Sequence, residues 1–457
     1  MPDELKGFGG GLNATLIHPV VLVIMLSTIL LLLLLPQKYR IVPLLLCIFS
    51  VPQGQQFYIA GVHWYVIRVV ILSGLISLLF SKRKSSRSQL ADRFNFIDRA
   101  FLVYVLCEAS ATLMRNMSTP ALLNQVGFLI DYLGAYFLIR RLIKDEADVH
   151  IAIKCLAVIA AIQGIEMVRE QIVGVNMFGM LGGVRLYPEL RNDHLRSTGV
   201  FQHTLTAGTI GGTLVPLFLL LWKRAKATWI ALVGLAGCTL MTITSHSSTP
   251  LLAYAFSFLG LAFWPIRNNM RFVRWAIVIF LIVLNFTMKA PVWFVIAHVD
   301  LTGGSSGWHR AELIDQFFRH FKEWWLLGTD NTDSWGFDMW DAQNQYVQVG
   351  DQGGLLALVW FIAMISHCYK RLGLARKSAK SNSQKWGIWC LGATLLATCS
   401  GFFGVNYFDQ SRVVWFLLLA IICCMTAKVS STPAVQITRP LVEWSPIADP
   451  VRIEGTA

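Results

Sequence analysis

Apolar stretches recur along the whole chain, and most are long enough to cross a lipid bilayer. They lie near residues 17–35, 40–52, 64–80, 99–114, 121–139, 149–168, 203–222, 228–244, 250–265, 274–290, 353–369, 386–402 and 412–427. Each predicts a helix, because a backbone in lipid must satisfy its own hydrogen bonds. The second is short and interrupted by Pro43 and Pro52. We therefore expect an all-α fold: one polytopic transmembrane helix bundle, residues 1–457, with about 12–13 spans.

The composition supports a membrane protein and excludes several other classes. Of 457 residues, 55% are hydrophobic and only 14% are charged, whereas soluble domains carry roughly 25% charged residues. A soluble enzyme, a disordered protein and a disulfide scaffold are therefore excluded. The nine cysteines lie in apolar stretches or at their ends without a CxxC pair, so we expect no disulfide framework and no metal site. The net charge of +13 does not gather on one soluble face, so no nucleic-acid partner is expected.

The basic residues predict the orientation in the membrane. Most of the 39 lysines and arginines fall in alternate loops and the tail: Lys38, Arg40, Lys82, Arg83, Lys84, Arg87, Arg93, Arg99, Arg140, Arg141, Lys144, Lys223, Arg224, Lys226, Arg267, Arg271, Arg274, Lys370, Arg371, Arg376, Lys377, Lys380, Lys385, Lys428, Arg439 and Arg452. By the positive-inside rule these loops and the tail 428–457 are cytoplasmic. No cleavage site follows the first Leu-rich run, so we expect a retained helix. The N-terminus lies outside with thirteen spans and inside with twelve.

Two long connections, 169–202 and 289–352, fall on the opposite, extracytoplasmic side. In the second, apolar residues recur with a helical period from Trp308 to Leu326, which predicts an amphipathic helix on the outer membrane surface. Ser306 is its expected N-cap, and Trp324 and Trp325 are expected at headgroup depth. Arg310 falls on the apolar stripe and needs a partner, because burying a lone charge is costly. Either its side chain snorkels to the membrane surface, or its partner is a carboxylate such as Asp300 or an anionic ligand.

Three further groups of polar residues are candidates for chemistry. Arg196 and His203 precede an apolar helix, where they would either supplement a phosphate site at a helix N-terminus or anchor the helix at the headgroups. His246 lies in a short Ser/Thr-rich turn and is either a hydrogen-bonded turn residue or a catalyst. Carboxylate, amide, phenol and indole groups occur together over residues 338–346, a combination that suits sugar recognition.

Ionisable residues inside the apolar stretches are few: Arg68, Glu108, Asp131, Lys154 and Glu166. Each is either a functional group or a side chain that reaches the membrane surface from a span end. Gly208, Gly211 and Gly212 lie within one span and predict close helix packing. The two halves of the chain show no convincing repeat of the kind common in transporters.

The order of these motifs resembles a known family. An arginine, a glycine and an aromatic residue precede a span (Arg196, Gly199 and Phe201), and a Ser-His-Ser turn joins two spans (Ser245–Ser247). The large outer loop then carries an early arginine, a Leu-Gly pair, an x-Asn-x-Tyr stretch and a Gly-rich helix start (Arg310, Leu327-Gly328, Gln343–Tyr346 and Gly353-Gly354). This pattern resembles the O-antigen ligase and O-antigen polymerase superfamily of bacterial inner-membrane glycosyltransferases. Two positions depart from it: His246 stands where the family usually has Arg, and Gln343 where many members have His.

The resemblance implies a metal-independent glycosyltransferase without a cofactor. Its donor would be an undecaprenyl-pyrophosphate-type lipid-linked glycan, its partners a glycan acceptor, the lipid bilayer and other polysaccharide assembly proteins, and its location the bacterial inner membrane. The expected roles are pyrophosphate binding for Arg196, Arg310 and His203, general base for His246, Asp341 or His309, and sugar binding for Gln343, Asn344, Tyr346 and Trp340. Because Gln343 cannot act as a base, a polymerase is favoured. The alternatives are a ligase that transfers polymer to lipid A core or protein, a flippase or exporter of lipid-linked glycan, and a non-catalytic export partner.

Overall fold

The computed structural model describes residues 14–59, 61–80, 94–222, 227–298 and 307–427. It is mostly helical, with few strands. The elements are, in order, α1 (Pro19–Leu34), η2 (Gln37–Tyr39), α2 (Ile41–Ile48), β1 (Gln56–Ile59), β2 (Val62–Tyr65), α3 (Val66–Leu79), α4 (Phe96–Arg115), α5 (Thr119–Leu129), η3 (Ile130–Gly134), α6 (Ala135–Leu142), α7 (Glu146–Val173), η4 (Phe178–Leu181), β3 (Glu189–Arg191), β4 (His194–Arg196), α8 (Thr204–Leu219), α9 (Thr228–Thr244), α10 (Ser248–Ala262), α11 (Met270–Thr287), η5 (Val292–His298), α12 (Gly307–Arg319), α13 (Phe321–Trp324), η6 (Asp333–Trp335), α14 (Gln345–Ser378), α15 (Asn382–Gly401) and α16 (Ser411–Met425).

A helix lies over each of the predicted apolar stretches. By length and composition, four helical segments are long and apolar enough to cross a membrane: Thr119–Leu142, Glu146–Val173, Met270–Thr287 and Gln345–Ser378. Helix starts follow from local sequence, as in α7, where Asp145 and Asp148 bond each other's backbone N–H groups in a capping box. The tail 428–457, the predicted N-cap Ser306 and Asp300 lie outside the described residues.

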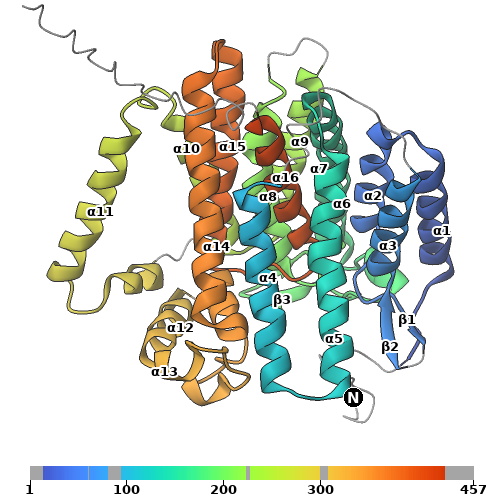
Figure 1. The fold of residues 1–457 in the computed structure, drawn as a ribbon, viewed down its shortest axis with the longest axis horizontal. Helices are drawn as coiled ribbons and strands as arrows, with labels where there is room; N and C mark the ends of the chain where they lie inside the picture. The colour runs from blue at the N-terminus through green and yellow to red at the C-terminus, as the bar shows by residue number, and fades with distance from the viewer. Residues whose placement is uncertain (1–13, 60, 81–93, 223–226, 299–306, 428–457) are drawn as a thin grey trace, which may run out of the picture.

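Most helices pack around one apolar core, whereas α12 and α13 contribute to a separate small core. Helix α11 stands apart at one side of the molecule (Figure 1) and has no buried residue. The glycines of α8 allow the close packing that the sequence predicts. A Cβ atom at Gly211 would lie 2.8 Å from the carbonyl oxygen of Cys238 in α9, and one at Gly212 would lie 2.7 Å from that of Pro250 in α10. All nine cysteines are free, and seven of them are buried.

The expectation of an all-α fold is incomplete, because the described residues include two antiparallel hairpins, β1–β2 and β3–β4. The first hairpin lies at the same end of the molecule as α12 and α13, whereas the α10–α11 connection lies at the opposite end (Figure 1). Both hairpins are too short to show an alternating pattern that stands out from the neighbouring apolar stretches.

The predicted surface helix over 308–326 is divided into α12 and α13, because the helix is interrupted between Arg319 and Phe321. Its C-terminal part therefore folds back, and Trp324 is only 2% exposed and stacks on Phe317 with ring centroids 3.9 Å apart. Trp324 thus belongs to a small separate core, and its expected place at headgroup depth stays a prediction. Trp325 is 45% exposed.

Candidate functional site

The β3–β4 hairpin gathers four polar side chains on one face. Asn192 and Asp193 form its two-residue turn with φ angles of 50° and 60°, the left-handed conformation that such turns require and that Asn and Asp tolerate. The register pairs Glu189 with Arg196 and Arg191 with His194. Because side chains alternate along a strand, these four groups share one face.

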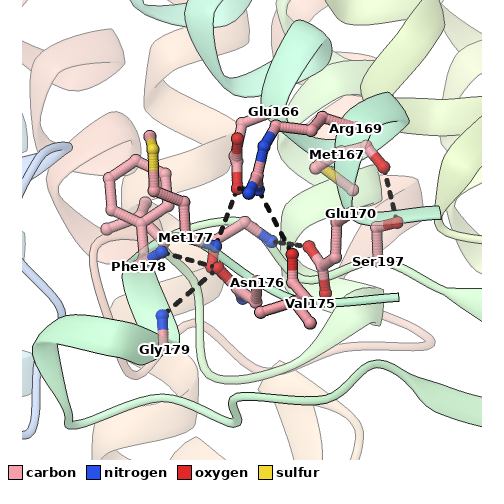
Figure 2. A network of polar contacts seen from close by, with 12 residues as sticks. Glu166, Met167, Arg169, Glu170, Val175, Asn176, Met177, Phe178, Gly179 and Ser197 are labelled. Carbon is pink, nitrogen blue, oxygen red and sulfur yellow. Dashed lines mark hydrogen bonds and ion pairs between the residues drawn. The ribbon is translucent and has the colours of Figure 1, made fainter. Parts of the chain in front are cut away.

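The chain after β4 is fastened to α7, as Figure 2 shows for Ser197, whose hydroxyl donates to the carbonyl oxygen of Met167 at 2.7 Å. The buried Glu170 carboxylate accepts the backbone N–H groups of Thr198 and Gly199 at 3.0 and 2.9 Å. Gly199 is required here, because its φ is +57° and a Cβ atom would lie 2.7 Å from the side-chain oxygen of Gln163. These bonds fix the position of Arg196.

The preceding part of the same connection is held by α7 as well. Glu166 accepts from Arg169 Nη1 at 2.9 Å and from the backbone N–H of Met177 at 2.8 Å, and Asn176 receives the N–H of Phe178 at 2.9 Å (Figure 2). The predicted intramembrane residue Glu166 therefore organises the connection between α7 and β3.

Arg196 ties the hairpin to the turn between α9 and α10. Its Nε donates to the carbonyl oxygen of Ser245 at 3.3 Å, Nη2 donates to the hydroxyl of Ser247, and Nη1 lies 3.4 Å from a Glu189 carboxylate oxygen. The side chain is buried, so these bonds replace the water it has lost. The arrangement brings together the first and second predicted motifs, which are about 50 residues apart in the chain.

His246 lies between these two serines and takes a positive φ of 41°. Its ring stacks on that of His194 with centroids 4.8 Å apart and planes 1° from parallel. Burial, together with the neighbouring His194 and Arg196, lowers the pKa of His246 below its ordinary value of 6.5. At neutral pH the imidazole is therefore neutral and able to accept a proton.

Arg310 joins this group from α12. It lies on the buried face of the helix, as its spacing predicts, and is only 6% exposed. Its Nε is buried without a hydrogen-bond partner in the described part of the chain. Burial, Arg191 and Arg196 lower its pKa to about 10, so it stays charged at neutral pH. We refer to Arg185, Arg191, Arg196 and Arg310 as the arginine cluster.

Glu189 is one carboxylate that bonds to the arginine cluster. It lies 3.4 Å from Arg196 and 3.8 Å from Arg185. Burial is the largest influence on the Arg310 pKa. The cluster thus brings several cations together, an arrangement that favours binding of an anion.

Two other predicted residues lie apart from these contacts. His203 precedes α8, is exposed, and has its ring 5.5 Å from that of Phe408 in the α15–α16 connection. Its expected place beside the pyrophosphate groups therefore has no contact to support it. His309 is half-buried in α12, next to Arg310 in sequence.

The predicted sugar-binding residues form the start of α14. Gln343 donates to Asp341 at 2.9 Å, while Trp340 is 69% exposed. Asn344 is buried and caps α14 by accepting the N–H groups of Tyr346 and Val347. The Tyr346 hydroxyl donates to the carbonyl oxygen of Cys399 at 3.1 Å. Asn344 and Tyr346 therefore shape this segment, and Asp341, Gln343 and Trp340 are its accessible polar groups.

The structure adds His194, Arg191 and Glu189 to the residues that the sequence singles out. A strand register places them beside Arg196, and short hairpins carry little sequence signal apart from the Asn-Asp turn. The described residues contain no group of three His, Cys, Asp or Glu side chains arranged to hold a metal ion. No family model and no curated protein matches this chain.

Proposed function

We propose that this chain is a multi-pass protein of the bacterial inner membrane that polymerises lipid-linked glycans at its extracytoplasmic face. Its donor is a glycan on an undecaprenyl-pyrophosphate-type carrier, and its acceptor is a hydroxyl group of a second glycan. Other proteins of polysaccharide assembly are its expected partners. The four helices long enough to cross a membrane, with the many shorter apolar helices, support the membrane location.

Arg310 is the single observation that carries the proposal. Its side chain is buried and charged, and its Nε atom has no hydrogen-bond partner in the described part of the chain. Such a charge costs several kcal/mol unless a ligand compensates it. A diphosphate is suited to this role, because it carries negative charge and accepts the paired N–H donors of arginine.

The chemistry requires few other groups. The acceptor hydroxyl oxygen attacks the anomeric carbon, the bond from that carbon to the diphosphate oxygen breaks, and the diphosphate leaves with the bonding electron pair. Arg310 and the remaining donors of Arg196 stabilise the charge that develops on the leaving group. The hydroxyl proton passes to a base, for which His246 is best placed, being neutral and beside Arg196. Asp341 and His309 are the alternatives.

Substitution of Arg310 by lysine tests the proposal. Lysine keeps the charge but loses the forked donors, so a transferase should lose activity by about 10²- to 10³-fold while the protein still inserts and folds. The assay is extension of a purified lipid-linked oligosaccharide by the reconstituted protein. Arg376→Lys is the matched control, because Arg376 donates to Asn268 at an exposed site away from the arginine cluster. Full activity of Arg310→Lys would contradict the proposal.

The same assay separates the alternatives. Chain extension identifies a polymerase, and transfer of glycan to lipid A core or protein identifies a ligase. Movement of the lipid across the vesicle bilayer without a new product identifies a flippase or exporter. In a deletion strain, loss of long chains with single repeats retained supports the polymerase, whereas full-length polymer left on its carrier supports the ligase.

A further inference from the structure

His194 and His246 form a pair of imidazoles that the proposed reaction does not fully use. They come from β4 and from the α9–α10 turn, and their rings lie parallel with centroids 4.8 Å apart. Arg196 bonds to both residues that flank His246, so the turn and the strand are held in register. The two rings therefore share one electrostatic environment, and their protonation is coupled.

Arg196 acts on His246 directly, and further cations lie near Arg196. Arg196 lies on β4, Arg191 on β3, Arg185 in the connection before β3, and Arg310 on α12. Helices α9 and α10 contribute no charged residue. The hairpin also carries two carboxylates: Asp193 in its turn, next to His194, and Glu189, which Arg185 and Arg196 share. Without a ligand, burial, His194 and Arg196 oppose protonation of His246.

We infer that the stacked imidazoles of His194 and His246 take up one proton when a diphosphate binds to the arginine cluster. This inference rests on the proposed function, because it assumes that the cluster is the diphosphate site. The two negative charges of the ligand offset the arginine charges and remove the opposition to protonation. A second proton is disfavoured, because it would place two cations 4.8 Å apart. The remaining neutral imidazole stays available as a base.

Linkage makes the inference measurable, because a proton taken up on binding also strengthens binding as the pH falls. A suitable probe is a farnesyl methyl diphosphate diester, whose charge does not change near neutral pH. Its affinity for the purified full-length protein should weaken by about 50- to 100-fold between about pH 6 and pH 8. Calorimetry at about pH 7 in buffers of different ionisation enthalpy should show uptake of about one proton.

Variants locate the proton. The double substitution His194→Asn with His246→Asn should bind the diester with an affinity that does not change with pH, and asparagine tolerates the positive φ of position 246. The single variant His194→Asn leaves one imidazole and should keep the pH dependence, which provides a test if the double variant does not fold. His150→Phe is the matched control, because His150 lies in the second turn of α7, far along the chain from the hairpin.

Two results overturn the inference in different ways. Binding of the diester with no pH dependence and no proton uptake refutes the linkage but leaves the diphosphate site of the proposed function intact. A pH dependence that persists in the double variant also refutes the linkage and leaves the diphosphate site intact. Absence of binding at every pH refutes both the linkage and the diphosphate site.

Discussion

Arg196, Arg310 and Arg68 are three buried arginines with different surroundings. Three N–H donors of Arg196 bond to the Ser245–Ser247 turn and to Glu189. Arg68 makes a two-pronged ion pair with Asp131 at 3.0 and 2.7 Å. Arg310 has no such partner in the described part of the chain. The sequence places all three in or beside apolar stretches, and only side-chain geometry separates the structural cations from the one that remains unsatisfied.

This difference predicts opposite effects on stability. Arg310→Met removes an uncompensated buried charge and should raise the free energy of unfolding by about 1–3 kcal/mol while abolishing binding of the diphosphate diester. Arg68→Met leaves the half-buried Asp131 without its cation and should lower the free energy of unfolding by about 1–3 kcal/mol. Thermal unfolding of both variants in the same detergent provides the comparison. A loss of stability in Arg310→Met equal to that in Arg68→Met would show that Arg310 is a structural cation.

At the scale of elements, hydropathy predicted the helices because burial of apolar residues in lipid and in the core follows directly from composition. It could not predict the β3–β4 hairpin, in which backbone bonds and an Asn-Asp turn matter more than hydropathy. It also missed the break after Arg319, because the apolar period continues through the fold-back that buries Trp324. The arginine cluster depends on both features, so the sequence identified Arg196 and Arg310 but not their neighbours His194 and Arg191.

Helix α7 holds the hairpin in position. We therefore expect Glu170, which lies on α7, to affect ligand binding without touching the ligand. Glu170→Gln replaces one acceptor oxygen by a donor group facing the N–H groups of Thr198 and Gly199. We expect the free energy of unfolding to fall by about 1–3 kcal/mol and the affinity for the diester to weaken. Glu146→Gln, near the start of the same helix and more exposed, should change stability by less than about 0.5 kcal/mol. Equal behaviour of the two variants in unfolding and binding measurements would contradict this role.

At the scale of the molecule, the proposed chemistry requires one orientation in the membrane. The arginine cluster and the capped start of α14 must face the extracytoplasmic side, and the basic connections must face the cytoplasm. Outside the cytoplasm no nucleotide pool supplies activated sugars, so the bond energy must arrive with the lipid-linked donor. The fold supports this separation, because α12 and α13 lie at the opposite end from the α10–α11 connection (Figure 1). That connection carries Arg267 and precedes Arg271 and Arg274, which the positive-inside rule assigns to the cytoplasm.

Cysteine labelling tests this orientation in the intact protein. Seven of the nine native cysteines are buried, so a membrane-impermeant maleimide should give a low background. Trp340→Cys introduces a thiol at an exposed position before α14, and Asn268→Cys introduces one in the α10–α11 connection. In cells with a permeabilised outer membrane and an intact inner membrane, we expect labelling of residue 340 and protection of residue 268, with both labelled after lysis. The reverse pattern would place the arginine cluster in the cytoplasm, where nucleotide sugars are present and a lipid-linked donor is not required.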